Sequence, residues 1–237
     1  MPIDSVGLEK TLAHMRASNF EEVGVAVALQ RVVDSVQALF DVTGTGLMFV
    51  DDSQALRYVA ASDEGGRVLE IAQEEHGVGP CVDALILDTV VQVEDLSADA
   101  RYQAIASTVA SHGVRAVLGV PVHVGGSAVG SLDAYSHKPT AWDDSDVDAL
   151  RKFAAVTETI LATALLSERQ SNVVEQLEFA LHNRVTIERA VGILMARHRV
   201  DAVAAFNILR REARSQRRKV AALAEDVLDE FAPPPDG

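Results

Sequence analysis

The C-terminal region carries the most regular hydrophobic pattern of the chain, in three consecutive segments. In each segment apolar residues recur at intervals of three and four, which is typical of an amphipathic helix. Three short helices with one apolar stripe each become stable by burying those stripes together. The pattern therefore predicts a three-helix bundle between Leu177 and Glu230. Its apolar positions are Ile187, Ala190, Val191, Leu194 and Met195, then Phe206, Leu209 and Ala213, then Val220, Leu223, Ala224, Val227, Leu228 and Phe231.

The preceding region mixes helix and strand patterns. Helical periodicity runs from Phe20 to Phe40, with Asn19 as the expected cap, and Gly125-Gly126-Ser127 later gives a strong hairpin signal. Because strands and helices do not alternate strictly, an α+β domain around an antiparallel sheet with flanking helices is favoured. Strands are expected at 47–52, 56–62, 90–95, 115–124 and 128–136, and further helices at 67–77 and 97–113. Glu64-Gly65-Gly66 is expected to break the chain, and Gly77 to Cys81 to open a loop.

The length of 237 residues fits two domains. Residues 1–19 show little pattern and are expected to be a lead-in, and residues 232–237 a disordered tail. The α+β domain then covers residues 20–165, and the all-α domain, with a linker helix, covers residues 166–231.

A long helix is expected between the two domains. It begins at Asp143-Asp144-Ser145-Asp146, and no proline or glycine occurs from Ala141 to Val191. A seam at alternating spacings of three and four predicts a parallel coiled-coil homodimer, although it is interrupted at two polar positions. The alternative is that the first half packs on the sheet of its own domain. The seam positions are Phe153, Val156, Ile160, Thr163, Ser167, Gln170, Val174, Leu177 and Leu181.

Composition bounds the location of the protein. Hydrophobic residues make up 48% and charged residues 24% of the chain, which is ordinary for a globular protein with real cores. No apolar run approaches the roughly 20 residues that a membrane span needs. The N-terminus lacks a signal-peptide pattern, and one cysteine allows no intrachain disulfide. We therefore expect a cytoplasmic protein.

Charge separates the bundle from the rest of the chain. Residues 184–219 contain ten Lys or Arg against three acids, a formal +7, whereas the whole chain carries −14. Asn207, Arg210, Arg211, Arg214 and Arg218 are expected on one face, turned away from the apolar stripe. Such a basic face indicates a phosphate-rich partner. A solvated surface paired with the acidic remainder is the alternative.

This C-terminal stretch resembles the ANTAR domain, an RNA-binding output module of bacterial antitermination regulators. The residues that carry the resemblance are Ala180-Leu181, Arg184, Ile187-Glu188, Ala190, Gly192-Ile193-Leu194-Met195, Ala205-Phe206, Leu209-Arg210 and Lys219. Val191 departs from the pattern, because the family usually has a lysine there. The resemblance implies RNA binding, with Arg184 and Arg210 as motif residues.

The region before it resembles a GAF domain of the kind paired with ANTAR in actinobacterial regulators. The matching stretches are Gly79 to Ala84, Asp95-Leu96, Gly113 to Ala116, Val120 to Val122 and Gly130 to Asp133. The resemblance implies a sensor or dimerisation role for about residues 20 to 165, with a possible small-molecule ligand. From these motifs we take Cys81, Asp83 and Asp133 as candidate pocket residues.

Catalytic and metal-binding patterns are weak. Cys81, His76 and His112 have no recognisable metal spacing. Some GAF domains are methionine sulfoxide reductases, but that chemistry recycles through several cysteines and this chain has one. The acids at 51–52 and 143–146 are explained as turn and cap residues. We therefore expect no enzyme activity, no metal and no cofactor.

The sequence thus predicts an RNA-binding antitermination regulator. A homodimer, formed through the GAF domain and the linker helix, is expected to bind paired stem-loops in a nascent transcript and to prevent terminator formation. Two alternatives stay open: a sensor scaffold that binds acidic proteins, and a duplex-DNA-binding regulator. The expected RNA contacts are Arg184, Arg197, Arg210, Arg214, Arg218 and Lys219.

Overall fold

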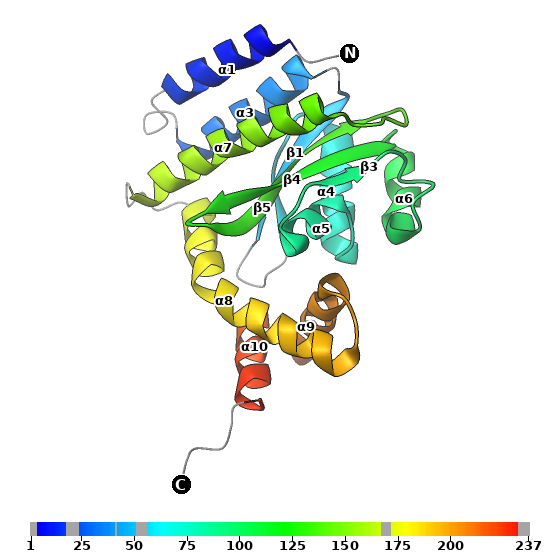
Figure 1. Cartoon of the computed structure of the whole chain (residues 1–237), viewed down its shortest axis with the longest axis vertical. Coiled ribbons are helices and arrows are strands. Elements are labelled where there is room, and N and C mark those ends of the chain that lie inside the picture. Colours follow the sequence, from blue (N-terminus) through cyan, green and yellow to red (C-terminus); the bar gives the residue numbers. More distant parts are fainter. Residues whose placement is uncertain (1–3, 18–23, 41, 51–55, 167–171, 232–237) are drawn as a thin grey trace.

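The computed structural model describes residues 4–17, 24–40, 42–50, 56–166 and 172–231. Within these ranges an antiparallel sheet with helices on both faces precedes three C-terminal helices (Figure 1). The predicted α+β domain followed by an all-α bundle is therefore confirmed. Asn19, Phe20 and the expected tail at 232–237 lie outside the described residues, as do both acids at 51–52 that were expected in a turn.

Five strands form one sheet in the order β2-β1-β5-β4-β3, and every neighbouring pair is antiparallel. The strands are β1 (Gly44–Val50), β2 (Leu56–Ala61), β3 (Val91–Val93), β4 (Ala116–Val124) and β5 (Ser127–Ser136). Gly125 and Gly126 join β4 to β5 with φ of 58° and 82°. This two-residue turn needs positive φ at both positions, which glycine supplies. The predicted hairpin is confirmed.

Residues alternate between the two faces of the sheet along a strand, so both faces present apolar side chains. Helices cover each face and bury these side chains. On β5, Leu132 and Ala134 face one core, which helices α1 (Ser5–Ala17), α3 (Val25–Leu39) and α7 (Asp144–Leu166) complete. Ser131 and Asp133 have the opposite parity. That second face is covered by α4 (Glu64–His76), α5 (Pro80–Leu87) and α6 (Gln103–Ala110), with the one-turn helix η1 (Ala100–Tyr102) before α6.

Helix α1 corrects the expected lead-in over residues 1–19. Leu8, Leu12 and Met15 recur at spacings of four and three and are buried against the core of α3 and α7. This stripe of three residues is short and lies among polar residues, so its periodicity was too weak to predict the helix.

Two glycine-containing turns also differ from expectation. Gly65 and Gly66 lie in the first turn of α4 instead of breaking the chain, after the cap Asp63. A Cβ at Gly65 would lie 2.4 Å from Oη of Tyr135, so glycine here permits close helix–sheet packing. The loop predicted from Gly77 ends at Gly79, because Pro80 is the first residue of α5.

The expected single helix between the domains is wrong. α7 ends at Leu166, α8 (Asn172–His198) begins six residues later, and the two run in different directions (Figure 1). Phe153, Val156 and Ile160 of the predicted dimer seam are at most 1% exposed within their own domain. The alternative, that this half of the seam packs on its own sheet, therefore holds. Ser167 and Gln170 lie outside the described residues.

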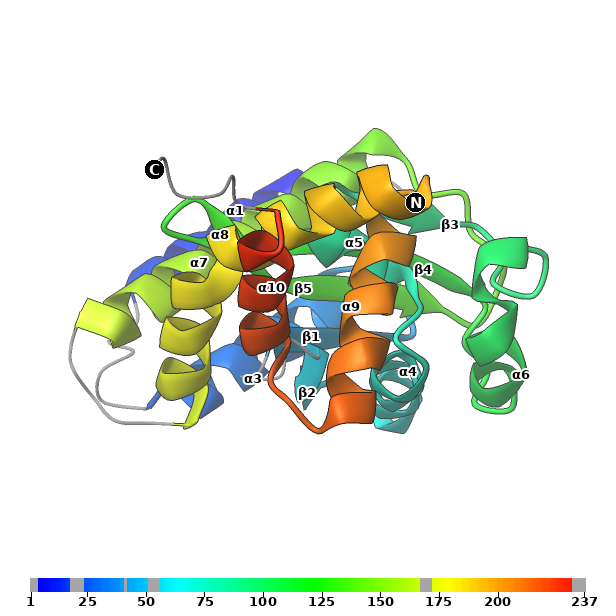
Figure 2. The same cartoon turned by 90° about the horizontal axis from the view of Figure 1, so that it is seen from below.

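The C-terminal bundle consists of α8, α9 (Ala202–Gln216) and α10 (Val220–Asp229). It lies below the α4–α5 side of the sheet in Figure 1, and Figure 2 views the molecule from its side. The predicted stripes form its core, so the three-helix prediction is confirmed. Leu228 and Phe231 are the exceptions, because Leu228 is only half-buried and lies outside this core, and Phe231 is 65% exposed.

Candidate nucleic-acid interface and sensor site

Short turns set the geometry of the bundle. Asp201 caps α9 by accepting a hydrogen bond from the Ala204 amide at 2.8 Å. α9 ends where Arg217 adopts a left-handed conformation with φ of 54°, and α10 begins after Lys219. This tight turn brings three consecutive cations, Arg217 to Lys219, to the surface between the two helices.

A cluster of exposed cations, which we call the basic tip, follows from this turn. The last turns of α9 add further arginines, and all members of the cluster are exposed. A helix C-terminus favours positive charge, so the cluster also agrees with the dipole of α9. The basic tip consists of Arg211, Arg214, Arg217, Arg218 and Lys219.

Two predicted contact residues make surface ion pairs inside the bundle. Arg218 pairs with Asp226, and this contact lowers the pKa of the Asp226 carboxyl. Nη1 and Nη2 of Arg197 each lie 3.3 Å from Glu230 Oε2. Exposed pairs of this kind contribute little to stability, so a phosphate can compete for either arginine. The alternative, a solvated surface whose cations pair with acids of the same chain, therefore applies in part: Arg197 and Arg218 each have an acidic partner.

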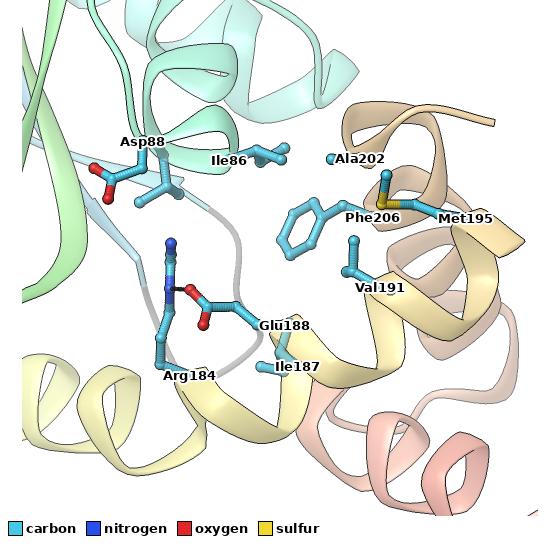
Figure 3. Close-up of a pocket in the computed structure, with 11 residues that line it drawn as sticks. Ile86, Asp88, Arg184, Ile187, Glu188, Val191, Met195, Ala202 and Phe206 are labelled. Carbon is cyan, nitrogen blue, oxygen red and sulfur yellow. Dashed lines mark hydrogen bonds and ion pairs between the residues drawn. The ribbon is translucent and has the colours of Figure 1, made fainter. Parts of the chain in front are cut away.

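Arg184 lies between the bundle and the sheet domain. Its Nε donates to Glu188 Oε1 at 2.5 Å, and its side chain is 14% exposed. Both residues line a pocket of about 280 Å³ whose other walls are α5 and α9. Figure 3 shows the Arg184 side chain extending from α8 towards Asp88, beyond the end of α5. In this arrangement Arg184 faces the pocket and not open solvent.

Arg210 corrects the predicted basic face. The residue is only 9% exposed, and a Cβ at Gly77 would lie 2.6 Å from its Nη1. Its guanidinium also lies 5.9 Å from the Phe206 ring centroid. α9 thus packs on two sides, with Leu209 towards the bundle and Arg210 towards the α4–α5 turn. The other arginines of the predicted face, Arg211, Arg214 and Arg218, are exposed and belong to the basic tip.

Val191 has a packing role at the position where the resemblance leads one to expect lysine. It is 9% exposed, belongs to the core of the bundle, and lines the pocket beside Phe206 (Figure 3). A lysine ammonium here would have to leave this apolar surrounding to reach solvent. The apolar residue therefore suits the contact between α8 and α9.

The structure brings two of the three predicted pocket residues together. Cys81 on α5 donates to Asp133 Oδ2 on β5, with 2.7 Å between Sγ and the oxygen. Asp83 is directed elsewhere: its Oδ2 accepts a hydrogen bond from the Tyr102 hydroxyl at 2.7 Å. Burial raises the pKa of the Asp83 carboxyl despite this hydrogen bond. Asp83 therefore joins α5 to η1 and is not part of the Cys81–Asp133 group.

Glu70 and Gln73 of α4 complete that group, and the sequence did not predict either. Both are fully buried. Burial and the neighbouring Asp133 raise the pKa of the Glu70 carboxyl. Burial and the two carboxyl groups likewise raise the pKa of the Cys81 thiol. One signal in the sequence could have indicated them. Glu70 and Gln73 lie next to Leu69 and Ala72 on the apolar face of a short helix, and a buried helix face rarely carries polar residues.

Comparison with known domains agrees with this division of the chain. The model of the GAF domain matches residues 25–161, and the model of the ANTAR domain matches residues 175–228. A search of curated proteins found no match. Among the described helices, none combines the length and the apolar character needed to cross a membrane.

Solved structures resemble the first of the two domains. A GAF domain of a cyanobacterial phytochrome, with bound phycocyanobilin, shares 12% identity at a TM-score of 0.55, covering 69% of this chain and 98% of that one. A GAF domain from an Acinetobacter phosphoenolpyruvate-protein phosphotransferase shares 19% at 0.52, covering 67% and 92%. Free methionine-R-sulfoxide reductase from Neisseria meningitidis shares 21% at 0.52, covering 65% and 84%. These likenesses support the fold alone. With one family model matching more than half of its length, the chain belongs to the GAF domain family, and an ANTAR domain follows its GAF domain.

Proposed function

We propose that this protein is a non-enzymatic, cytoplasmic transcription antitermination regulator. In this proposal its ANTAR domain binds paired stem-loops in a nascent transcript and prevents a terminator from forming. The GAF domain senses a signal and controls that binding. The observation that carries the proposal is the basic tip on a domain of the ANTAR type, in a chain whose net charge is −14.

The chemistry of the basic tip supports an RNA partner. Four of its five members are arginines, whose planar guanidinium pairs with phosphate and stacks on unpaired bases. Phe206 is buried in the core, and Phe231, although 65% exposed, follows the other end of α10, so neither offers a stacking platform at the tip. Binding through phosphate contacts and arginine stacking is therefore the expected mode.

A homodimer fits recognition of two stem-loops, one by each ANTAR domain. We propose that the GAF domain and helices α7 and α8 provide the contact. Leu166 at the end of α7 is 85% exposed, and Val27 on α3 is 48% exposed. The helical layer formed by α3 and α7 therefore presents apolar side chains to solvent. Light scattering of the purified chain tests this directly: a monomer at micromolar concentration would remove the dimer from the proposal.

Binding to a double stem-loop RNA at several salt concentrations tests the main proposal. The variant Arg211→Ala, Arg214→Ala removes two exposed cations of the tip. Each lost phosphate contact flattens the salt dependence, so the slope of log affinity against log salt should fall by about 1.5. Arg210 is unsuitable for this test because it packs against the GAF domain.

The matched control is Lys10→Ala, Arg16→Ala, which removes the same charge from exposed positions on α1, outside the proposed dimer contact. We expect it to keep the wild-type salt slope. Equal slopes for both double variants and the wild type would contradict the assignment of the basic tip. Equal binding of duplex DNA and double stem-loop RNA would instead favour a DNA-binding regulator. Readthrough of a leader terminator in vitro, with and without the protein, tests antitermination itself.

A further inference from the structure

A buried group of potential metal ligands lies inside the GAF domain. Glu70 from α4, Cys81 from α5 and Asp133 from β5 are each 0% exposed. One ligand atom from each residue can be chosen so that all lie within 4.8 Å of one another. Tetrahedral metal–ligand bonds of about 2.0 to 2.3 Å place ligand atoms roughly 3.3 to 3.8 Å apart, about 1 Å or a little more below this upper limit. Small side-chain adjustments would therefore suffice to surround one ion.

Unpartnered oxygens converge on the same place. Among the described residues, Glu70 Oε1 and Asp133 Oδ1 are fully buried and accept no hydrogen bond. Both face Gly46 on β1: a Cβ there would lie 2.1 Å from the Glu70 oxygen and 3.0 Å from the Asp133 oxygen. Ser131 Oγ, two residues before Asp133 on the same face of β5, is also buried without a partner. Buried polar atoms without partners are rare, so this concentration requires an explanation.

Gln73 holds the other sides of the group in place. Its Oε1 accepts the amide hydrogen of Cys81 at 2.9 Å, and its Nε2 donates to Glu70 Oε2 at 3.1 Å. The same Nε2 lies 3.2 Å from Cys81 Sγ. Gln73 thus fixes the thiol and one carboxyl group relative to each other. Residues that orient metal ligands by hydrogen bonds act in this way in established sites.

The electrostatics of the group demand a positive charge. Two carboxyl groups and a thiol are buried together, and no basic side chain among the described residues has a hydrogen bond or ion pair to them. Buried carboxylates are normally paired with a cation or bound to a metal. Without a metal the group must retain protons, and the Glu70 and Asp133 oxygens that face Gly46 then have only each other as partners.

We propose that Glu70, Cys81 and Asp133 form a binding site for one divalent transition-metal ion, of the zinc or ferrous iron class. A thiolate ligand disfavours Mg²⁺ and Ca²⁺, whereas two carboxylates beside one thiolate suit these borderline ions. Binding displaces the protons on Cys81 and on the carboxyl pair to solvent, so that three anionic ligands surround the ion. The bound ion would join α4, α5 and β5, the elements that form one face of the GAF core. This site is independent of the RNA-binding proposal.

Cobalt(II) is the probe for the first test, since a Co²⁺–thiolate bond gives a charge-transfer absorption band. The full-length reduced protein, freed of metal with a chelator, is titrated with Co²⁺. We expect one equivalent per chain to bind with such a band, and Zn²⁺ to displace it. Cys81→Ser should abolish the band. Glu70→Gln and Asp133→Asn, which preserve volume, should weaken binding at least about tenfold.

His123→Gln is the matched control for adventitious binding, because His123 lies between Asp88 and Glu158 at the surface. Its Co²⁺ affinity should equal that of the wild type. The absence of a band, or a band that survives Cys81→Ser, would overturn the proposal.

A second measurement uses the wild-type chain alone, so it does not depend on whether the variants fold. It compares the thermal unfolding temperature with and without metal. Zn²⁺ should raise Tm of the wild type, because an ion that binds only the folded state stabilises it, and Mg²⁺ at the same concentration should not. Equal Tm values with Zn²⁺, with Mg²⁺ and without metal would also overturn the proposal.

Discussion

Asp95 and Arg115 form an ion pair with two hydrogen bonds in the GAF domain. Arg115 donates from Nε at 3.1 Å and from Nη2 at 2.5 Å, one to each oxygen of the carboxylate. The Leu96 amide donates to the Arg115 carbonyl at 2.7 Å, so the pair fastens the loop before η1 to β4. The hydrogen bonds from Arg115 and Ser97 hold the pKa of the Asp95 carboxyl well below its ordinary value.

The lowered pKa of Asp95 predicts an acid-dependent contribution to stability. A carboxyl group with a depressed folded-state pKa stabilises the fold above its unfolded pKa, near 3.9, and loses that contribution as the pH falls towards the folded value. In Arg115→Gln the pKa of Asp95 should rise towards 3.9. NMR titration of the Asp95 side-chain carboxyl measures this shift. An unchanged, low pKa in the variant would show that the hydrogen bonds from Ser97 suffice alone.

Single residues also show where sequence reasoning reaches its limit. Cys81 and Asp133 were predicted as pocket residues from motifs, and the structure places them in contact. Glu70 was missed because only the packing of α4 on β1 brings its carboxyl to Asp133. Arg210 was placed on a solvent-facing helix face by its spacing, yet a second domain covers that face. Periodicity assigns a residue to a face of its helix but does not reveal what another domain covers.

At the scale of elements, the strength of the pattern decided what could be predicted. The three stripes of the bundle and the Gly125-Gly126 hairpin were predicted, because each depends on local spacing or turn chemistry. Helix α1 was missed because its stripe is short. The change of direction between α7 and α8 was missed for a different reason: continuous helical propensity does not reveal that α7 packs on its own sheet while α8 turns away.

Phe206 and Phe231, one buried and one exposed, give an element-scale prediction. Phe206 on α9 is 6% exposed in the core, whereas Phe231 after α10 is 65% exposed. Phe206→Ala should destabilise the bundle by about 3 to 5 kcal/mol. Phe231→Ala should change stability by at most about 0.5 kcal/mol, as surface substitutions usually do.

Denaturant unfolding followed by the NMR signals of α8 to α10 measures both variants, and the GAF signals serve as an internal reference. The comparison also separates local from global effects, because a loss confined to the bundle should leave the GAF transition unchanged. A large loss in Phe231→Ala would mean that this side chain has a packing partner in solution, such as a second copy of the chain.

At the scale of the whole molecule, the contact between α5 and α9 joins the GAF domain to the ANTAR domain. Ile86 on α5 packs against the core of the bundle and also against the small GAF core that contains Cys81. The same contact region holds the pocket lined by Arg184, and Arg210 lies close by against Gly77. Two motif arginines are therefore turned towards the GAF domain, while the basic tip remains exposed. A change in the GAF core that moves α5 would reach α9 through Ile86.

This arrangement predicts that weakening the α5–α9 contact strengthens RNA binding. Ile86→Ser removes the apolar bridge, so Arg184 and Arg210 become available to RNA, and affinity for a double stem-loop should rise about fivefold or more, the usual size of a coupling between two sites. Gel-shift titration measures the affinity, and faster hydrogen exchange in α9 should accompany the gain. The matched control is Leu87→Ser, because Leu87 is the next residue of α5 and is already 46% exposed. If Ile86→Ser binds RNA as the wild type does, or if Leu87→Ser produces the same gain, the packed arrangement does not restrain the ANTAR domain. In that case the signal must reach the RNA-binding surface by a route that does not depend on uncovering these two arginines.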